Sequence, residues 1–448
     1  MLFLGIDMGT SYFKAGLFNG SGTLVGSGRV KVSKRVSGSR AELDIGLCWK
    51  SLRQCVFLAL EEAKSDSEAI TAMSYSSQAN TFLLMDKEKN PLTPLILWID
   101  ERYKKDERLS TFTGEPEWSE ITGIGIPFGA GFCMNKCRGM QEHQAAVWNK
   151  TRYIFTLPDY FAYCLTGQRQ VDSSTASLLG LMDLEKRCWW PAALQECGIS
   201  ENQLSPLCDI GADGGILGAE NPLGLPAGIR LFAGGLDHHM AAIGVGIGTM
   251  AKLSESTGTV IAAVLYSHNK DRIKDICMAP ALERGAYFKM GFDRNGAAAL
   301  EWYRENFAVE NTLEELIEMA EKVPAGCDGL VALPCSNLYP GKTGFLNQQT
   351  GFHHGYYIRA IMESTAESLK RLIQKVDQQQ ESNGVFSTGG GAKSILWGAI
   401  KKAVIQRDFF RNHNSEAACK GAAMVAAAGT KQLASVFEVQ KEWLTPLQ

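Results

Sequence analysis

Several short stretches of this 448-residue chain combine carboxylates or hydroxyls with glycine in patterns that suit phosphate chemistry. The first, GIDMGTSYFKAGLF at residues 5–18, is an apolar segment that reaches Asp7, turns at Gly-Thr-Ser and continues apolar. Amides and hydroxyls at Thr10 and Ser11 would line a concavity for phosphate oxygens. Asp7 could hold a hydrated Mg²⁺, and Lys14 could return toward the same anion. A plain tight hairpin, with Asp7 accepting turn amides and Lys14 in solvent, is the alternative.

The second stretch, FAGGLDHHMAAIGVG at residues 232–246, predicts a Gly-Gly turn followed by Asp237 at the start of a small-residue helix. A carboxylate there has backbone donors nearby and can stay ionised, which suits a general base. Asp237 as a simple N-cap is one alternative. His238 and His239 as metal ligands are another, although adjacent histidines diverge on a helix and no HExxH-like partner is present.

The third stretch, STGGGAKS at residues 387–394, differs from a Walker A loop because Ala392 stands where GxxxxGK[ST] needs a glycine before Lys393. A glycine triplet between a strand and a helix lets a flat ring or a ribose lie close to the backbone. The same triplet is typical of a turn that packs a strand closely against a helix. The pattern alone leaves both interpretations open.

Two further stretches, SYSSQANTFLLMD and LILWIDER, place polar and aromatic residues at the ends of expected strands. They contain Gln78, Asn80, Trp98, Asp100 and Arg102. Such residues offer amides for hydroxyl groups and an indole face for C–H bonds, a mixture that suits polyol recognition. Each of them taken singly is more often an ordinary loop residue.

The composition favours a globular protein that handles small molecules. With 45 basic and 48 acidic residues the net charge is −3, so no broad field attracts nucleic acid or an anionic membrane. No stretch approaches the roughly 20 apolar residues that span a bilayer, and the apolar start meets Asp7 too early for a signal peptide. The twelve cysteines show no paired metal spacing. We therefore expect a cytoplasmic protein without nucleic-acid or membrane partners; a homodimer is allowed, but the sequence does not determine the oligomeric state.

The elements that must hold these residues fall into two similar halves. Residues 2–31 alternate strand and turn, an antiparallel meander unlike a dinucleotide fold, which places a helix after its first glycine turn. Residues 251–266 are again strand, hydroxyl-rich turn and strand, and residues 358–376 show clear helical periodicity. We expect two domains, residues 1–245 and 246–448, that face each other across a cleft.

In their order and spacing these stretches resemble the FGGY carbohydrate kinase family of the actin-like ATPase superfamily, nearest to its pentulose and xylulose-kinase-like members. GIDMGTSYFKAGLF is similar to the family's first phosphate motif, FAGGLDHHMAAIGVG to the segment of its catalytic aspartate, and SESTGTV to its second phosphate motif. LPDYFAYCLTGQRQVDSSTAS is like its Leu-Thr-Gly stretch. STGGGAKSILW and EAACKGAAMVAAAG resemble its adenosine-binding end. The resemblance covers nearly the whole chain.

The resemblance implies an α/β fold of two actin-like, ribonuclease H-like domains, in which helices flank mixed sheets and ATP and sugar bind in the cleft. It implies transfer of the γ-phosphate of ATP, with Mg²⁺, to a hydroxyl of a small sugar or polyol of the ketopentose or ketohexose type.

By position, the resemblance also implies roles for single residues. Asp237 would take the proton from the sugar hydroxyl, and Asp7 would hold Mg²⁺ through water. Thr10, Ser11 and Lys14 would meet the β- and γ-phosphates. The other implied contacts are Gly258 and Thr259 for the phosphates; Gly390, Gly391, Ala392 and Ser394 for adenosine; and Gln78, Ala79, Asn80, Trp98, Asp237 and His238 for the sugar.

The chain departs from the family pattern mainly on the sugar side. Xylulose kinases show Met-His and glycerol kinases Arg-Glu where this chain has Ala79 and Asn80, so the pattern supports neither substrate. The residue after the catalytic aspartate, often Asn or Gln, is His238, and Gly139 stands at the tryptophan position of the family's Lys-x-x-Trp signature. The resemblance therefore indicates kinase chemistry but leaves the sugar undetermined.

Two other classes of function compete with a kinase. An actin-like ATPase acting as a chaperone or filament subunit would share both phosphate turns but would not need Asp237 beside polyol-binding side chains. A catalytically weak, sugar-binding regulator would fit the irregular signatures, although Asp7 and Asp237 are both present. A dinucleotide-dependent enzyme is disfavoured because no GxGxxG with a following acidic residue occurs in a strand-helix-strand setting.

Overall fold

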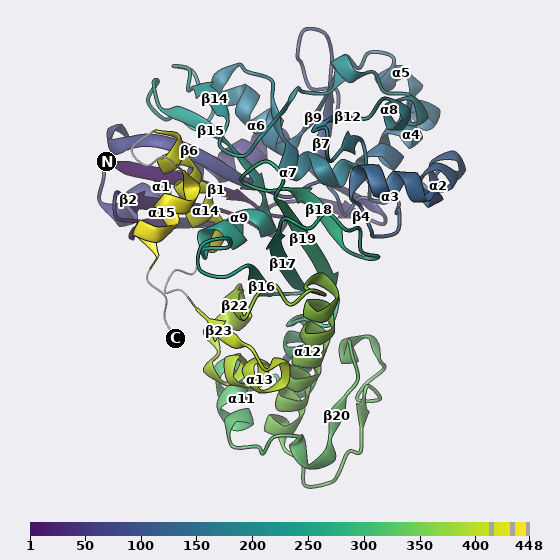
Figure 1. Ribbon diagram of the computed structural model, residues 1–448, viewed down its shortest axis with the longest axis vertical. Helices are drawn as coiled ribbons and strands as arrows, with labels where there is room; N and C mark the ends of the chain where they lie inside the picture. Colours follow the sequence, from purple (N-terminus) through teal and green to yellow (C-terminus); the bar gives the residue numbers. More distant parts are fainter. Residues whose placement is uncertain (412–415, 431–434, 445–448) are drawn as a thin grey trace. The chain divides into compact units, whose positions relative to one another are not determined.

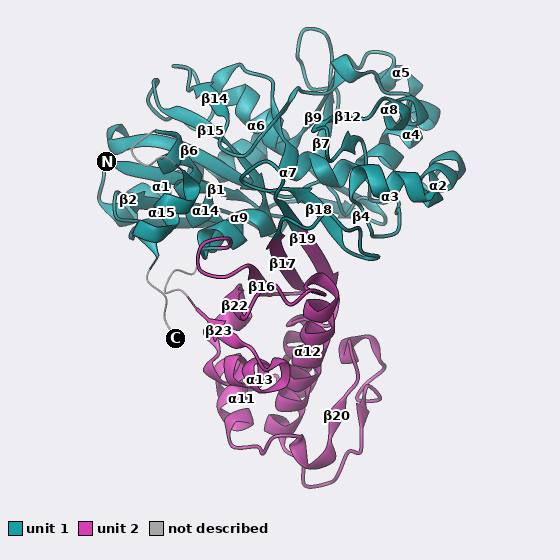
Figure 2. Cartoon of the chain, viewed as in Figure 1, with its two compact units in different colours: residues 1–246, 267–288, 416–444 teal, residues 247–266, 289–415, 445–448 magenta. Residues whose placement is uncertain are grey.

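The computed structural model describes residues 1–411, 416–430 and 435–444, and the chain divides into two compact units (Figures 1 and 2). Unit 1 comprises Met1–Gly246, Ser267–Phe288 and Glu416–Leu444, and unit 2 comprises Ile247–Tyr266, Lys289–Ser415 and Thr445–Gln448. Two segments from the second half of the chain thus group with unit 1. The division into domains at residues 245 and 246 stays a prediction.

The central sheet of unit 1 has six strands in the order β14-β15-β6-β1-β2-β3. Its strands are β1 (Leu2–Met8), β2 (Tyr12–Asn19), β3 (Leu24–Lys31), β6 (Ile70–Ser77), β14 (Asp213–Ile216) and β15 (Arg230–Leu236). β1, β6 and β15 run parallel, whereas β2, β3 and β14 are joined antiparallel. The antiparallel meander predicted for the first residues is confirmed as β1-β2-β3, and the predicted mixed sheet is confirmed with it.

Helices pack on both faces of this sheet. They are α1 (Ile45–Ala63), α6 (Leu157–Thr166), α7 (Ser173–Ala176), α9 (Asp237–Gly244), α14 (Ala417–Gly429) and α15 (Val436–Trp443). A Cβ at Gly5 would lie 1.9 Å from a carbonyl oxygen of α14, and a Cβ at Gly28 would lie 1.9 Å from one of α1. Gly5 pairs with Gly16 across the strands, whereas Gly28 pairs with the adjacent Ala15. Because successive strand residues face opposite sides, α14 and α1 cover opposite faces.

The remainder of unit 1 is a second, five-stranded sheet with a helical region around a separate apolar core. The strands follow the order β4-β5-β8-β7-β9, with bounds β4 (Arg35–Ser37), β5 (Arg40–Leu43), β7 (Phe82–Met85), β8 (Leu95–Ile96) and β9 (Tyr153–Thr156). The helices are α2 (Glu107–Gly114), α3 (Pro116–Thr122), α4 (Cys133–His143), α5 (Ala145–Trp148) and α8 (Pro191–Cys197), and short strands are β10 (Val171–Asp172), β11 (Met182–Asp183), β12 (Cys188–Trp189), β13 (Leu207–Cys208) and β18 (Cys277–Pro280).

Unit 2 has its own mixed sheet, in which β19, β17, β16, β22 and β23 are successive neighbours. Its strands are β16 (Leu253–Thr257), β17 (Ile261–Ser267), β19 (Tyr287–Asp293), β22 (Gly384–Thr388) and β23 (Asp408–Phe410), with a small hairpin of β20 (Val331–Ala332) and β21 (Phe345–Leu346). Its helices are α10 (Ala298–Phe307), α11 (Leu313–Glu321), α12 (His354–Val376) and α13 (Ile395–Ile405). The predicted strand-turn-strand repeat is confirmed as the antiparallel pair β16-β17, and the predicted long helix as α12.

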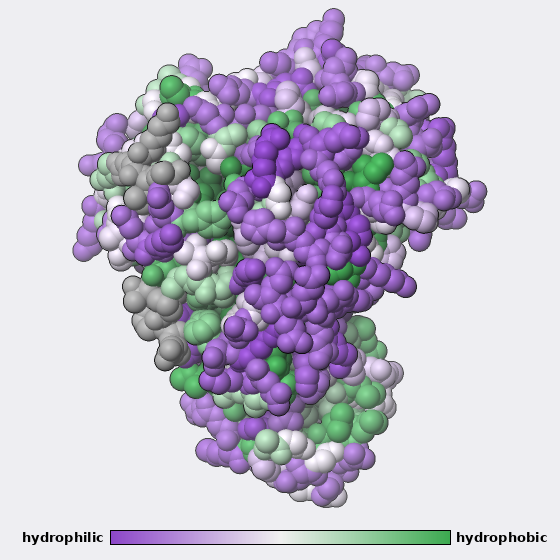
Figure 3. Space-filling model, in the orientation of Figure 1, coloured by the Kyte–Doolittle hydropathy of each residue, from purple (hydrophilic) through white to green (hydrophobic). Residues whose placement is uncertain are grey.

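The surface seen in Figure 3 is largely hydrophilic, with apolar side chains in smaller patches. Exposed apolar residues of unit 2 include Val331 and Leu346, which face each other across the β20-β21 hairpin. Among the described residues, no helix is long and apolar enough to cross a membrane.

Helix α9, which begins with Asp237, is held against α14 by two glycines. A Cβ at Gly421 would lie 1.9 Å from the carbonyl oxygen of Met240, and a Cβ at Gly244 would lie 2.0 Å from that of Ala417. The helix backbones therefore approach more closely than any side chain would allow. The residues of α14 are small and mostly apolar, and the helix is buried along nearly its whole length.

We predict that Gly421→Ala forces α9 away from α14 and lowers the free energy of unfolding by about 1–3 kcal/mol, the usual cost of overpacking. Gly398→Ala is the matched control, because Gly398 lies in α13 with nothing within 4 Å of its missing Cβ. That variant should gain about 0.5–1 kcal/mol from helix propensity. Urea unfolding of both variants checks the prediction, and equal effects would contradict it.

Candidate functional site

Three neighbouring parallel strands of unit 1 end at residues singled out from the sequence. Asp7 in β1 pairs in register with Ser76 in β6, and Ser76 pairs on its other side with Gly235 in β15. Asp237 follows β15 directly as the first residue of α9. Ligand sites of open α/β sheets lie at the carboxyl ends of parallel strands. The topology thus brings Asp7 and Asp237 to one edge of the sheet.

Asp7 is buried, and its burial disfavours the ionised carboxylate. Its Oδ1 accepts a hydrogen bond from Ser76 Oγ at 2.7 Å. Burial raises the pKa of Asp7 to about 6; Lys14, opposite it on β2, acts to lower the pKa, and the carboxylate of Asp237 acts to raise it. The two aspartates are therefore close enough to sense each other's charge.

The oxygen donors of Asp7 and Asp237 fit a hard divalent cation such as Mg²⁺, which prefers carboxylate oxygens and would offset their repulsion. The described residues contain no group of three or more His, Cys, Asp or Glu side chains that could hold a metal ion. A cation here would therefore need further oxygens from water or a bound phosphate, as is usual for Mg²⁺.

Asp237 occupies the first helical position of α9 and does not cap the helix as an N-cap residue. The N-cap is Leu236, and Asp237 Oδ1 accepts the adjacent amide of His238 at 2.8 Å. The predicted Gly-Gly turn before Asp237 is wrong, because Gly234 and Gly235 lie inside β15. A Cβ at Gly234 would lie 1.7 Å from the carbonyl oxygen of Tyr75, so glycine is required for β15 to approach β6.

The two histidines after Asp237 differ in environment. His238 is half-buried, whereas His239 is buried and stacks on Phe288 with ring centroids 4.7 Å apart. His239 Nδ1 lies 2.8 Å from Ser174 Oγ, and burial lowers the pKa of His239 to about 3. Ser174 Oγ also accepts the amide of Leu236 at 3.0 Å. His239 thus belongs to the packing beneath the start of α9.

Lys14 forms an ion pair with Glu416, a residue that was not predicted to belong to the site. Its Nζ lies 2.9 Å from Glu416 Oε2, at the N-terminal end of α14. Burial acts to lower the pKa of Lys14, but Asp7 and Glu416 act in the other direction and the net result is a raised pKa. Glu416 immediately precedes α14, whose residues are small and mostly apolar, and an acidic residue at that helix start was the available signal in the sequence.

Thr10, Gln78 and Trp98 form one hydrogen-bonded cluster. Trp98 Nε1 donates to Thr10 Oγ1 at 2.7 Å, and Thr10 Oγ1 donates to Gln78 Oε1 at 3.3 Å. Thr81 Oγ1 also donates to Gln78 Oε1, at 3.1 Å, and accepts the amide of Trp98 at 3.0 Å. Gln78 is buried, whereas the Trp98 side chain is 45% exposed. Thr10 of the first glycine turn therefore meets two of the expected sugar residues, Gln78 and the partly exposed Trp98; Ser11 in the same turn is exposed.

Asn80 uses its side chain within the protein. Its Nδ2 donates to the carbonyl of Leu178 at 2.9 Å, and its Oδ1 accepts the amide of Cys133 at the start of α4, also at 2.9 Å. Asn80 has a positive φ of 58°, and the neighbouring Ala79 is buried. The sugar contact expected for Asn80 stays a prediction, and these bonds give the side chain a role in shaping the loop.

Lys136 is a buried cation that was not predicted to belong to the site. Its Nζ donates to the carbonyls of Asn80 at 3.1 Å and Leu97 at 2.8 Å, so it joins the two loops that carry the expected sugar residues. Burial lowers the pKa of Lys136 to about 8. One turn later, a Cβ at Gly139 would lie 2.2 Å from the Tyr103 ring, which explains why no tryptophan fits at this signature position.

Asp100 and Arg102 form a structural ion pair. Arg102 Nη2 donates to Asp100 Oδ2 at 2.7 Å and also bonds Glu42, and Asp100 Oδ2 accepts the amide of Ala41. The Asp100 side chain is fully buried. The polar groups of Asp100 and Arg102 therefore bond within the protein and are not available to bind a polyol.

Unit 2 carries the other expected nucleotide residues in two turns. Gly258 and Thr259 join β16 to β17, and Thr259 is exposed. The amide of Ala297 donates to the carbonyl of Gly258 at 2.7 Å, and a Cβ at Gly296 would lie 2.5 Å from the carbonyl oxygen of Thr259. The carbonyl side of this turn is thus covered by the protein backbone.

The second turn connects β22 to α13 and includes Gly390, Gly391, Ala392 and Ser394. Gly390 is exposed and has open space around its missing Cβ, whereas a Cβ at Gly391 would lie 2.9 Å from that of Thr257. Ser394 is the N-cap of α13 and its Oγ accepts the amide of Trp397 at 3.2 Å. Gly391 and Ser394 therefore have packing and capping roles, and Gly390 offers open backbone.

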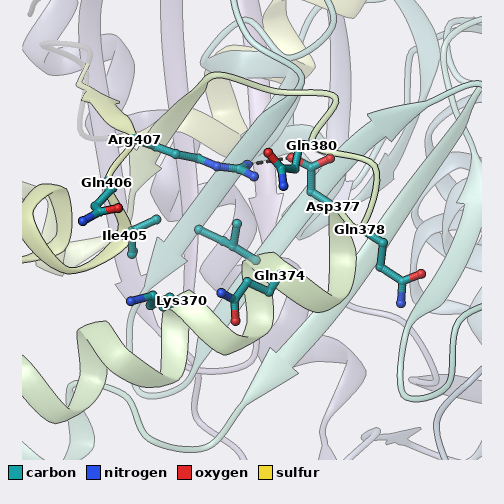
Figure 4. Close-up of a pocket in the computed structure, with 9 residues that line it drawn as sticks. Lys370, Gln374, Asp377, Gln378, Gln380, Ile405, Gln406 and Arg407 are labelled. Atoms are coloured by element: carbon teal, nitrogen blue, oxygen red, sulfur yellow. Dashed lines mark hydrogen bonds and ion pairs between the residues drawn. The ribbon is translucent and has the colours of Figure 1, made fainter.

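A separate pocket in unit 2 contains none of the residues expected in the site. It is lined by α12, by residues 377–380 and by residues 405–407 (Figure 4). Arg407 points across it to Asp377, with Nη1 2.6 Å from Oδ2. This pocket is built around an internal ion pair.

A family model, curated sequences and solved structures each match this chain. The N-terminal domain model of the FGGY family of carbohydrate kinases matches residues 2–244. The chain is 26% identical to the xylulose kinase of Bacillus subtilis, covering 98% of this chain and 91% of that protein, and 25% identical to an autoinducer-2 kinase of Escherichia coli, covering 97% and 87%. The solved xylulose kinase structure from Rhodospirillum rubrum has a TM-score of 0.87 at 22% identity, covering 100% of this chain and 93% of that one. The ligand-bound xylulose kinase from Lactobacillus acidophilus has a TM-score of 0.86 at 18% identity, with the same coverage.

We predict that Lys136 makes stability rise with pH in alkaline solution. Its ordinary pKa of 10.5 falls to about 8 in the folded protein. Between these values the unfolded chain binds the proton and the folded chain does not, so the free energy of unfolding should rise by up to about 3 kcal/mol.

Urea unfolding of the wild type and of Lys136→Met from pH 7 to 10 measures this effect. The Met variant cannot titrate at this position, so the difference between the two proteins should grow in favour of the wild type as pH rises. A difference that stays constant across this range would show that Lys136 does not titrate there.

Proposed function

The chain belongs to the FGGY family of carbohydrate kinases, and we propose that Asp237 is the general base that activates the acceptor hydroxyl in its ATP-dependent phosphorylation of a sugar or polyol. One observation carries this assignment. Asp7 and Asp237 gather at one edge of the unit 1 sheet, in different surroundings and within electrostatic reach of each other. Two carboxylates with different environments suit two different tasks.

Asp237 has the properties that a base needs. It is half-buried and accepts one hydrogen bond from the adjacent amide at the start of α9. A carboxylate in this position can take the proton of a sugar hydroxyl as the hydroxyl attacks the γ-phosphate. General base catalysis of this kind contributes about 10²–10⁴-fold to the rate.

Asp7 is the proposed residue for Mg²⁺. A bound Mg²⁺ would supply charge neutralisation on the phosphate oxygens. Ser76 Oγ fixes the orientation of the Asp7 carboxylate, and Lys14 supplies the nearest positive charge. Asp7 is thus oriented to hold an ion, while the proton transfer belongs to Asp237.

Thr10, Ser11 and Lys14 are the proposed phosphate contacts of unit 1. Ser11 is exposed in the turn, and Thr10 is oriented by Trp98 and Gln78. Lys14 shares its charge with Glu416, so we expect Lys14 to divide its hydrogen bonds between Glu416 and phosphate when nucleotide is bound.

The proposed contacts of unit 2 are Gly258 and Thr259 for the phosphates and Gly390, Gly391, Ala392 and Ser394 for adenosine. The exposed Thr259 and the open backbone at Gly390 support the two turns as places of ligand approach. Gly391 and Ser394 would act mainly by shaping their turn.

The proposed acceptor is a small ketose or polyol held by Gln78, Ala79, Asn80, Trp98 and His238. The exposed indole of Trp98 offers a face for the C–H bonds of a sugar. Xylulose kinases among the relatives favour a ketopentose as the first candidate. The small Ala79 and the internal bonds of Asn80 favour an acceptor that makes few polar contacts at these two positions. A cytoplasmic location and a homodimer stay predictions.

We predict that Asp237→Asn lowers sugar-dependent ADP formation by about 10²–10⁴-fold, because the amide cannot take the hydroxyl proton. Nucleotide binding should persist, since Asp7 and both glycine turns are unchanged. A coupled assay of ADP release and titration calorimetry with Mg·ADP measure the two effects.

Asp213→Asn is the matched control. Asp213 lies in β14 of the same sheet and forms an exposed ion pair with Arg230, a contact of little energetic weight. The control should keep wild-type turnover. Turnover of Asp237→Asn within tenfold of the wild type would refute the assignment of the base.

A further inference from the structure

A fully buried ion pair lies beneath the two glycine turns of unit 2. Lys401 Nζ in α13 lies 2.7 Å from Glu255 Oε1 in β16, and neither side chain is more than 1% exposed. The two residues are 146 positions apart in the chain. Removing two charges from water is costly unless each is paired and hydrogen-bonded, so such a pair requires an explanation.

The remaining hydrogen bonds of the pair are made to hydroxyl groups. Ser387 Oγ donates to Glu255 Oε1 at 2.5 Å, and Thr257 Oγ1 donates to Glu255 Oε2 at 2.7 Å. Lys401 Nζ donates to the same Thr257 Oγ1 at 2.9 Å, and Thr388 Oγ1 donates to the carbonyl oxygen of Glu255 at 3.0 Å. Both carboxylate oxygens are therefore used, and β16, β22 and α13 are joined through one centre.

The hydroxyl residues of this network are the last residues before the two turns. Thr257 immediately precedes Gly258 and Thr259, and Ser387 and Thr388 immediately precede the turn at residues 389–394. The network thus fixes the strand ends from which both turns begin.

The two turns also touch each other. Gly389 has a positive φ of 78°, and a Cβ there would lie 3.1 Å from both Ser256 Oγ and the carbonyl oxygen of Thr257. A Cβ at Gly391 would lie 2.9 Å from the Cβ of Thr257. A shift at Thr257 therefore moves the backbone of the second turn.

Stability alone does not account for this arrangement. Apolar residues of similar volume often stabilise a fold as well as, or better than, a buried ion pair does. Apolar side chains would fill the space but could not orient the hydroxyls of Thr257 and Ser387. What the ion pair adds is a defined position for the ends of two strands.

We propose that Glu255 and Lys401 are positioning residues that set the turns at residues 258–259 and 389–394 in the geometry that binds nucleotide. The proposal rests on the proposed function, which assigns these turns to phosphate and adenosine. It adds two residues, neither of which touches the nucleotide, that determine how tightly the nucleotide is bound.

The double variant Glu255→Met with Lys401→Met tests the proposal, because it removes both charges together and leaves no unpaired ion. It should unfold cooperatively, while its Kd for Mg·ADP and its KM for ATP rise about tenfold or more, the effect expected from losing one charged hydrogen-bond network. The KM for the sugar should stay within twofold of the wild type, because the sugar residues lie in unit 1. A purely structural pair would change the midpoint of unfolding without this selective loss of nucleotide affinity.

The ion pair of Asp377 and Arg407 supplies the matched control (Figure 4). Arg407 Nη1 lies 2.6 Å from Asp377 Oδ2, and Asp377 also accepts the amide of Ser382, before the opposite end of β22. The variant Asp377→Asn with Arg407→Met should therefore keep the wild-type Kd for Mg·ADP. An equal loss of affinity in both double variants would overturn the proposal by showing a general effect on unit 2.

Ser387→Ala is a milder variant in case the double variant does not fold. It keeps both charges and removes only the hydrogen bond to Glu255 Oε1, so we expect a threefold to tenfold weaker Kd for Mg·ADP, on the order of one hydrogen bond. Wild-type affinity in Ser387→Ala or in the folded double variant, measured beside an active wild type, would overturn the positioning role alone. A wild type that does not bind Mg·ADP would instead overturn the proposed function, and the positioning role with it.

Discussion

The parallel pairing of β6 with β1 on one side and β15 on the other is the constraint on which the site in unit 1 depends. Its register places Asp7, Ser76 and Gly235 in one row, so Asp237, the residue after β15, lies at the same sheet edge as Asp7, with β6 between their strands. Glycines allow the close packing of these elements. Gly234 lets β15 approach β6, and Gly421 and Gly244 let α14 pack closely against α9. A bulkier residue at any of these positions would displace the start of α9, and with it Asp237.

The roles proposed for the two aspartates would give one sheet edge two kinds of chemistry. Asp7 is buried and bonded to Ser76, and burial raises its pKa to about 6, so a cation is the natural counterpart of its ionised form. Asp237 is half-buried at a helix start, where its carboxylate accepts the adjacent amide of His238. The same surroundings hold Lys14 between Asp7 and Glu416. The groups named at this edge are thus three carboxylates and one ammonium, an excess of negative charge that the proposed metal ion would offset.

Much of the fold could be predicted because it follows from residue patterns within short stretches of the sequence. Alternation and turn residues indicated β1-β2-β3 and β16-β17, and helical periodicity indicated α12. The features that could not be predicted depend on contacts between residues far apart in the sequence. Gly234 and Gly235 read as a turn because nothing local shows that β15 must pass close to β6. The internal bonds of Asn80 and the buried ion pair of Glu255 and Lys401 likewise join residues that only the folded chain brings together.

The most direct test is the formation of ADP by the wild-type protein with ATP and Mg²⁺ in the presence of single ketopentoses, ketohexoses and polyols. If Asp7 and Asp237 serve phosphoryl transfer to an acceptor hydroxyl, at least one acceptor should raise the rate of ADP formation clearly above the rate without acceptor, because the bound hydroxyl then takes the phosphoryl group in place of water. ATP hydrolysis that no acceptor accelerates, or assembly into filaments when ATP is added, would contradict a carbohydrate kinase and favour an actin-like ATPase.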